Sequence, residues 1–178
     1  MIEHTPQGLY CRAADAWIDP WRPVPRALIT HAHADHARAG CGEYWAIDLS
    51  EGVLRQRLGQ EITLHPVHYG QDIWLGQCKV SFHSAGHVLG SAQIRLEAEN
   101  EVWVVSGDYK RDNDPSCDPF EPVRCDVLIT EATFGLPIYR WQSGASVARE
   151  IRDWWQGDRN RPSCLLYTSD AADETGRG

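Results

Sequence analysis

Seven short stretches rich in β-branched or aromatic residues recur along the 178-residue chain, and they restrict the folds it can adopt. Each stretch is bounded by Gly, Pro, Asp or Asn, which is typical of β-strands. Two other segments, 49–58 and 145–155, repeat apolar residues at helical spacing. Many strands with few helices predict a layered α/β domain. The predicted strands are residues 16–18, 27–30, 61–64, 79–82, 92–97, 102–106 and 126–130.

The charge balance argues against one class of function. Seventeen basic and 25 acidic residues give a net charge of −8. A protein that coats nucleic acid usually carries a basic surface, so this class is disfavoured. An enzyme whose bound metal ions supply the local positive charge remains compatible with the sequence. Most of the eight tryptophans are expected to pack in the core or to face a cap domain, and none is assigned to base stacking.

The cysteines and the N-terminus indicate the cellular setting. Six cysteines are widely spaced and include no Cys-x-x-Cys pair, which argues against a zinc ribbon and against a dense disulfide scaffold. The N-terminus lacks a basic segment followed by an apolar run, and no stretch approaches the roughly 20 apolar residues of a membrane helix. We therefore expect a cytoplasmic protein without a membrane anchor.

The last residues of the chain have a sequence unlike that of a natural C-terminus. The stretch "CLLYTSDAADE", residues 164–174, is identical to a translation of a transposon-type sequencing adapter. We therefore expect residues 164–178 to be a non-native tail and exclude them from the fold prediction. Residues 1–163 are then expected to be the N-terminal part of a longer domain.

One motif carries most of the predicted chemistry. The apolar stretch "ALIT" runs directly into "HAHADH", which contains His31, His33, Asp35 and His36. If the chain stays extended there, His31 and His33 project to the same side, because side chains alternate along a strand. The small alanines between them leave room for a metal ion. A solvated histidine-rich loop is the alternative interpretation of this motif.

Two later segments add candidate ligands at predicted strand ends. His87 follows a strand and is flanked by Gly86 and Gly90, which permit close backbone approach. Asp108 follows another strand after Gly107. Either residue alone would more often be structural, but their order after "HAHADH" favours a metal site.

The order of "HAHADH", "AGHVLGS" and "SGDYK" resembles the metallo-β-lactamase superfamily. This resemblance implies an αββα sandwich, of which the chain would hold the N-terminal portion, with two metal ions at one edge. It implies that His31, His33 and His87 hold one zinc ion, that Asp35 and His36 help hold a second, and that Asp108 bridges the two. Asp19 matches an early acidic residue that orients the first motif through hydrogen bonds.

Imidazole and carboxylate ligands suit Zn²⁺, although Mn²⁺ or iron would also fit. Two such cations, about 3.5–4 Å apart, activate water and stabilise the attacking and leaving oxygens of a hydrolysis. The sequence therefore predicts a hydrolase, with Asp19, Asp35 and Asp108 among its catalytic residues.

The stretch "CDVLITEATFGLP" points to the substrate class. Its Glu131-x-Thr133-x-Gly135 pattern resembles the nucleic-acid-processing, β-CASP-like branch of the superfamily, and it adds Glu131 to the catalytic candidates. The N-terminal segment most resembles bacterial exonucleases that act with DNA ligase in the DNA-damage response. The resemblance thus implies DNA as substrate, with a DNA ligase and an associated helicase as partners.

Three alternatives remain at this point. One is an RNA-cleaving relative of the factors that process mRNA 3′ ends. Another is a hydrolase of small thioesters or lactones, against which the Glu131 motif argues. The third is a metal-binding scaffold without catalysis, against which the complete early metal motifs argue.

The chain departs from the family pattern at its C-terminal end. Family members continue with an inserted cap domain and with later histidines that complete the second metal site and protonate the leaving group. Residues 138–163 contain no histidine. We therefore expect the chain as given to bind at most one metal ion tightly and to be catalytically inert.

Overall fold

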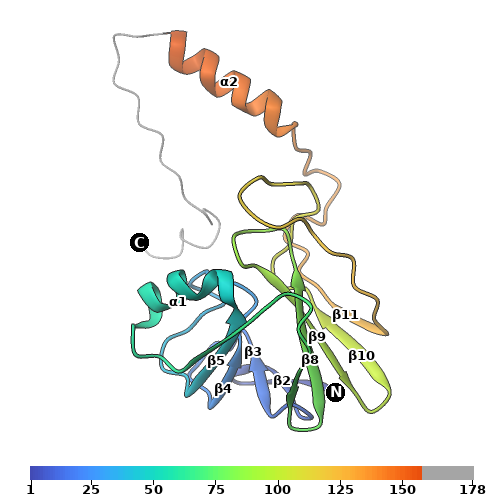
Figure 1. The fold of residues 1–178 in the computed structure, drawn as a ribbon. Helices are drawn as coiled ribbons and strands as arrows, with labels where there is room; N and C mark the ends of the chain where they lie inside the picture. The colour runs from blue at the N-terminus through green and yellow to red at the C-terminus, as the bar shows by residue number, and fades with distance from the viewer. Residues whose placement is uncertain (158–178) are drawn as a thin grey trace. The chain divides into compact units, whose positions relative to one another are not determined.

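The computed structural model describes residues 1–157, and the tail expected at 164–178 lies outside the described residues. The chain divides into two compact units, Met1–Glu131 and Ala132–Gly178. The first unit contains two β-sheets and the helix α1, and the second contains the helix α2 (Figure 1). Neither described helix is long and apolar enough to cross a membrane.

Sheet A has six strands in the order β1-β2-β3-β4-β5-β6. The first three are antiparallel neighbours, whereas β3 to β6 run parallel to one another. The parallel arrangement places the carboxyl ends of β3 and β4 side by side, with Ile18 paired to Leu28. The strands are β1 (Ile2–Thr5), β2 (Gly8–Cys11), β3 (Ala16–Ile18), β4 (Arg26–Leu28), β5 (Glu43–Ile47) and β6 (Leu64–Val67).

Sheet B has five strands in the order β11-β10-β9-β8-β7. Strands β7 to β10 are antiparallel neighbours, and β11 lies parallel to β10 with Ile129 paired to Val105. Strands β8, β10 and β11 therefore all point the same way. The strands are β7 (Ile73–Leu75), β8 (Cys78–Ser84), β9 (Ala92–Ala98), β10 (Glu101–Val105) and β11 (Val127–Ile129).

The two sheets share one apolar core. Inward-facing residues of sheet A, such as Ile18 and Leu28, pack in the same cluster as Phe82, Ile94 and Leu96 of sheet B. All five side chains are at most 1 % exposed. Burial of this apolar surface is the main force that holds one sheet against the other.

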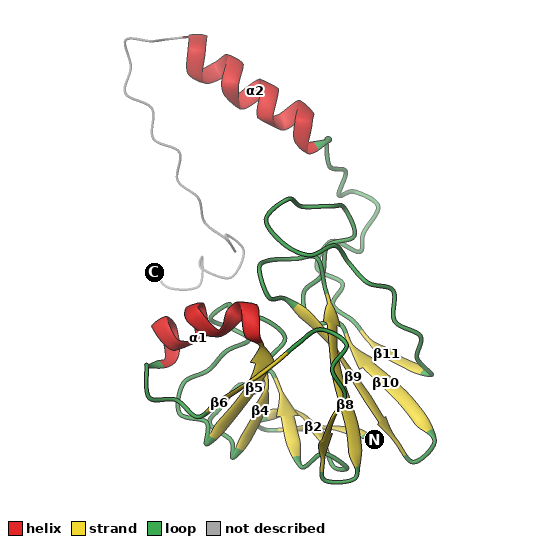
Figure 2. Ribbon diagram, in the orientation of Figure 1, coloured by secondary structure: helices red, strands yellow, loops and turns green. Residues whose placement is uncertain are grey.

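The helix α1 (Glu51–Leu58) follows a short 3₁₀ turn (Asp48–Ser50) and covers the outer face of sheet A (Figure 2). Its Leu54 is fully buried in a second apolar cluster that includes Tyr44 and Ala46 of β5. The first unit therefore has three layers, one helix and two sheets. This mixed α/β arrangement is compatible with an αββα sandwich.

Several predicted elements are shifted or were missed. The predicted strand 61–64 is wrong in position, because β6 begins at Leu64 and contains Pro66 at the sheet edge, where a missing N–H is tolerated. Strands β1, β2, β5 and β7 were not predicted. Of the eight tryptophans, which are expected to pack in the core or against a cap domain, five are at least 54 % exposed and so lie outside the core: Trp21, Trp74, Trp141, Trp154 and Trp155.

The second unit is described up to residue 157. Its helix α2 (Gly144–Gly157) contains the predicted helix 145–155. Phe134 lies edge-on against Tyr139 and Trp141, with ring centroids 5.2 Å apart in both pairs. This small aromatic cluster organises the segment between β11 and α2.

The helix layer yields a stability prediction. Leu54→Ala should lower the free energy of unfolding by about 2–5 kcal/mol, because it leaves a cavity between α1 and sheet A. Val53→Ala is the matched control, since Val53 precedes Leu54 on α1 but is 45 % exposed, and it should change stability by less than about 0.5 kcal/mol. Urea unfolding followed by circular dichroism would measure both. Equal effects of the two substitutions would show that α1 does not cover the sheet.

Candidate metal centre

The predicted site residues follow the carboxyl ends of five strands. Asp19 comes directly after β3, and His31 comes shortly after β4. On sheet B, His87 follows β8, Asp108 follows β10 and Glu131 follows β11. Because neighbouring parallel strands end at the same edge, the topology gathers residues that are up to 112 positions apart in the sequence.

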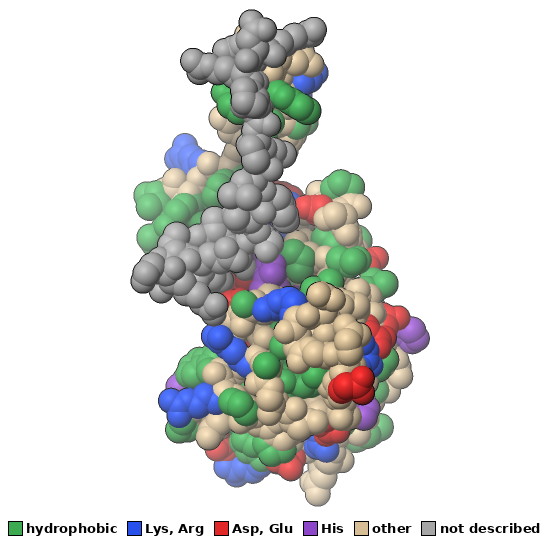
Figure 3. Space-filling model, turned by 90° about the vertical axis from the view of Figure 1, so that its left-hand side faces the viewer, with side chains coloured by type: hydrophobic (Ala, Val, Ile, Leu, Met, Phe, Trp, Pro, Cys, Tyr) green, Lys and Arg blue, Asp and Glu red, His purple; other side chains and the backbone are tan. Residues whose placement is uncertain are grey.

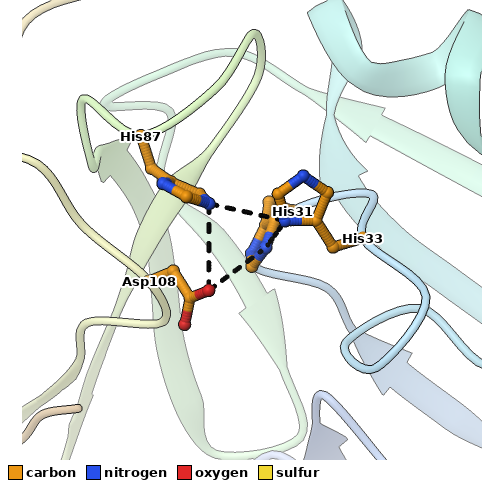
Figure 4. A group of neighbouring side chains, drawn as sticks. All are labelled: His31, His33, His87 and Asp108. Atoms are coloured by element: carbon orange, nitrogen blue, oxygen red, sulfur yellow. Dashed lines mark hydrogen bonds and ion pairs between the residues drawn. The ribbon is translucent and has the colours of Figure 1, made fainter. Parts of the chain in front are cut away.

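Four of these side chains converge closely (Figure 4). One ligand atom from each of His31, His33, His87 and Asp108 lies within 4.8 Å of the others. His33 Nδ1 lies 2.8 Å from His31 Nε2 and 3.4 Å from His87 Nε2. Asp108 Oδ2 lies 3.8 Å from both His31 Nε2 and His87 Nε2. Three ring nitrogens and one carboxylate oxygen therefore face a common point.

A second group lies on the other side of Asp108. His36 Nε2 is 3.4 Å from Asp108 Oδ1 and 3.2 Å from Asp35 Oδ2. Asp108 thus presents one oxygen to His31 and His87 and its other oxygen to His36. The carboxylate lies between the two groups, where a bridging ligand would have to be.

Asp19 holds the first motif in place. Its Oδ1 accepts a hydrogen bond from the backbone N–H of Thr30 at 2.8 Å, and its Oδ2 accepts one from Thr30 Oγ1 at 2.5 Å. The same Oδ2 lies 2.7 Å from His36 Nδ1. Asp19 adopts a φ of +42°, a left-handed conformation that Asp tolerates better than most residues.

These contacts fix which ring nitrogens face the site. A hydroxyl has one proton, and Thr30 donates it to Asp19, so Thr30 Oγ1 accepts from His31 Nδ1 at 3.1 Å. A carboxylate only accepts, so His36 Nδ1 is the donor to Asp19. His31 and His36 therefore both direct Nε2 towards Asp108. A partner on the remote nitrogen is the usual arrangement for a metal-binding histidine.

Two glycines permit the close approach of the segments. A Cβ atom at Gly107 would lie 2.6 Å from Thr30 Cβ, and one at Gly86 would lie 2.4 Å from the Lys110 carbonyl oxygen. Both glycines also have positive φ, +56° and +70° respectively. Any side chain at either position would push Asp108 or His87 away from the group.

Charges at the site are strongly perturbed. Burial lowers the pKa of His31 well below its usual value, so this ring is neutral. Burial also opposes a charge on His36, but hydrogen bonds to Asp108 and Asp19 outweigh it and raise the pKa of His36 to about 11. Burial opposes ionisation of Asp108, yet His36 and the other nearby histidines lower its pKa to about 2. A neutral His31 ring therefore faces an ionised Asp108, whereas His36 is protonated in the absence of metal and would have to lose its Nε2 proton to bind a cation.

This donor set fits a divalent metal ion. Zinc is bound by neutral imidazole nitrogens and carboxylate oxygens, commonly with three protein ligands and one open position. His31 is 1 % exposed. Without a metal ion, its buried imidazole would face two other imidazoles. The other described histidines outside the two ligand groups, His4, His65, His68 and His83, are not in the group of four.

Glu131 lies beside the second group rather than within it. It lines a cavity of about 380 Å³ together with Asp19, Asp35, His36 and Asp108. All eight residues singled out in the sequence are thus at or next to one site. Basic side chains on the face of the first unit seen in Figure 3 do not form one continuous patch, in keeping with the acidic composition.

Known proteins with similar sequences have the names of enzymes that act on DNA or RNA. The chain is 34 % identical over 146 residues to a probable DNA ligase of Opitutus terrae, and the match covers 81 % of the chain and 14 % of that protein. It is 33 % identical over 145 residues to a ribonuclease of Thermus thermophilus, covering 66 % and 33 %. It is 28 % identical over 162 residues to the endoribonuclease YSH1 of Mycosarcoma maydis, covering 69 % and 18 %.

The chain is related to nucleases of the metallo-β-lactamase/β-CASP type. The chain spans one third or less of the length of each of these relatives. No family model matches the sequence. The relationship to β-CASP nucleases agrees with the resemblance inferred from "HAHADH", "AGHVLGS" and "TEATFG".

Sequence reasoning missed three residues around this site. Thr30 connects Asp19 to His31, and Trp21 and Arg38 line the cavity beside the metal-binding group. Thr30 is the last residue of "ALIT", so its place before the first histidine was a usable signal. Trp21 and Arg38 each follow a predicted site residue by two positions, Asp19 and His36 respectively, but nothing in the sequence shows that their side chains line a cavity.

Asp19 should support metal binding without contacting the metal. Asp19→Asn keeps the shape of the side chain but replaces an acceptor that serves both Thr30 and His36. We expect zinc affinity to fall about 10- to 100-fold, the usual effect of removing an outer partner of a histidine ligand. Isothermal titration calorimetry would measure it.

Asp15→Asn is the matched control for this experiment. Asp15 also has positive φ, +48°, but it accepts a hydrogen bond from Tyr10 in the turn before β3, away from the site. Zinc affinity should be unchanged in this variant. Unchanged affinity in Asp19→Asn as well would contradict the positioning role.

Proposed function

We propose that the complete protein is a metal-dependent phosphodiesterase that degrades DNA as an exonuclease and acts with a DNA ligase in DNA repair. The observation that carries the proposal is the pair of ligand groups that share Asp108. The relationship to β-CASP nucleases supports nucleic acid as the substrate class. We further propose that residues 1–163 form the N-terminal part of the hydrolase domain and that the later residues are a non-native tail.

The residues divide into ligands and supporting groups. His31, His33 and His87 would hold one cation, most simply Zn²⁺, with Mn²⁺ or iron as alternatives. Asp35 and His36 would help hold a second cation, with Asp108 bridging the two. When bound, the cations supply Lewis-acid stabilisation of the charge that develops on the phosphate oxygens.

The protein itself supplies orientation. Asp19 fixes His36 directly and His31 through Thr30, so the ring nitrogens keep their direction during a reaction. Glu131 lies in the wall of the cavity next to Asp108. Its carboxylate can accept a hydrogen bond from a water molecule and orient it towards the phosphate. We propose Asp19, Asp35, Asp108 and Glu131 as the carboxylates on which activity depends.

RNA cleavage is the second candidate. It is favoured by the similarity to the Thermus thermophilus ribonuclease and to endoribonuclease YSH1. The similarity to a probable DNA ligase favours DNA and the proposed association with a ligase. The helicase partner is proposed only on the family resemblance. Five free cysteines in the described part of the chain support the proposed cytoplasmic setting.

A nuclease assay tests the proposal. The complete protein should shorten end-labelled DNA progressively from one end in the presence of zinc or manganese, and excess chelator should stop the reaction. Asp108→Ala should lower the rate at least about 1,000-fold, because it removes a ligand shared by both metal positions. His68→Ala is the control and should retain activity, since His68 pairs with Asp48 away from the site.

The substrates distinguish the candidate functions. Cleavage of RNA but not DNA would show that the second candidate function, that of a ribonuclease, is the correct one. Thioester or lactone hydrolysis without nuclease activity would contradict the proposal. Activity that persists in Asp108→Ala would show that the metal centre is not the active site.

A further inference from the structure

The cavity beside the metal centre contains residues that the mechanism above does not use. Its lining includes the acidic groups of the second ligand set and Glu131, together with Trp21 and Arg38. Its volume, about 380 Å³, lies within the range of about 300–1,000 Å³ that small-molecule sites occupy. We propose that this cavity binds one nucleotide of the substrate, with Arg38 on its phosphate and Trp21 against its base. This inference rests on the proposed phosphodiesterase function.

Arg38 is prepared to bind an anion. It follows the "HAHADH" motif by two residues, and its backbone carbonyl accepts a hydrogen bond from the buried Tyr44 hydroxyl at 2.8 Å, which anchors its position. Its Nε atom is buried and has no hydrogen-bond partner among the described residues. Because this nitrogen is closed to solvent, a ligand in the cavity would have to be held by the other nitrogens of the guanidinium. The planar guanidinium matches the geometry of a phosphate.

The charges of the cavity determine when an anion can bind. Among the described residues that line it, Arg38 is the single Arg or Lys, whereas Asp19, Asp35, Asp108 and Glu131 are acidic. These carboxylates would repel a phosphate at close range. Cations held by Asp35, His36 and Asp108 would offset that charge and leave Arg38 available. We therefore expect the nucleotide to bind only when metal is present.

Trp21 and the apolar lining residues suit a base. Trp21 is 54 % exposed although it lines the cavity, and its ring lies edge-on to His4 at 5.2 Å. An aromatic face of this kind can stack on any base, which suits an enzyme without sequence preference. The lining also includes apolar residues from both sheets: Leu9, Ile18, Val105 and Ile129.

Two probes separate the phosphate contact from the base contact. Binding of dAMP and of inorganic phosphate to the zinc-loaded complete protein, in which both metal positions can be filled, would be measured by isothermal titration calorimetry. Arg38→Ala should weaken both ligands about tenfold or more. Trp21→Ala should weaken dAMP by a similar factor but leave phosphate unchanged, because phosphate has no base to stack.

Matched controls lie elsewhere on the same sheets. Arg124→Ala removes an exposed arginine that precedes β11, at the opposite end of that strand from the cavity. Trp74→Ala removes a tryptophan on β7 that is 69 % exposed. Both variants should bind dAMP and phosphate as the unmodified chain does, and zinc affinity should be the same in all four variants.

The outcomes separate this inference from the proposed function. Nuclease activity of the complete protein with no effect of Arg38→Ala or Trp21→Ala on nucleotide binding would overturn the nucleotide site alone. Equal loss of phosphate binding in Trp21→Ala and Arg38→Ala would overturn the division of roles. Zinc-dependent dAMP binding that requires both residues, in a protein without nuclease activity, would support the site and contradict the proposed function.

Discussion

The metal centre depends on the contact that Thr30 makes between the two sheets. Its backbone carbonyl accepts a hydrogen bond from the N–H of Ala92, at the start of β9, at 2.7 Å. Gly107, which precedes Asp108, packs directly against the side chain of Thr30. Through its hydroxyl and backbone N–H, Thr30 also contacts Asp19 on sheet A. One buried residue thus aligns the histidines of sheet A with His87 and Asp108 of sheet B.

This arrangement explains why a concentration of charge is tolerated at the end of an apolar core. Three carboxylates at the site have specific partners: Asp19 has Thr30 and His36, Asp35 has His36, and Asp108 has three histidines. Removing one partner would leave a partly buried charge without compensation, which is costly. A divalent cation held by these groups would add further compensation, so metal binding should stabilise the first unit as well as prepare it for chemistry.

The site was more predictable from the sequence than the fold that builds it. The motif "HAHADH" has a spacing that chemistry explains, and His87 and Asp108 each follow an apolar strand, so their convergence could be anticipated. Strands β1, β2, β5 and β7 were missed because each is short and their pairing partners decide whether they form. Trp21 and Arg38 lie close in sequence to Asp19 and His36, but that their side chains line a cavity with Asp108 depends on the packing of the two sheets and could not be predicted.

The most direct test of the account is to locate zinc in crystals of the protein by anomalous diffraction at the zinc absorption edge. We predict a strong peak about 2.0–2.2 Å from His31 Nε2, His33 Nδ1 and His87 Nε2, with Asp108 as a further ligand. A second, weaker peak would lie near Asp35 and His36, on the opposite side of Asp108. Zinc bound only at other histidines, such as His65 or His68, would contradict the account, as would crystals that bind no zinc at all.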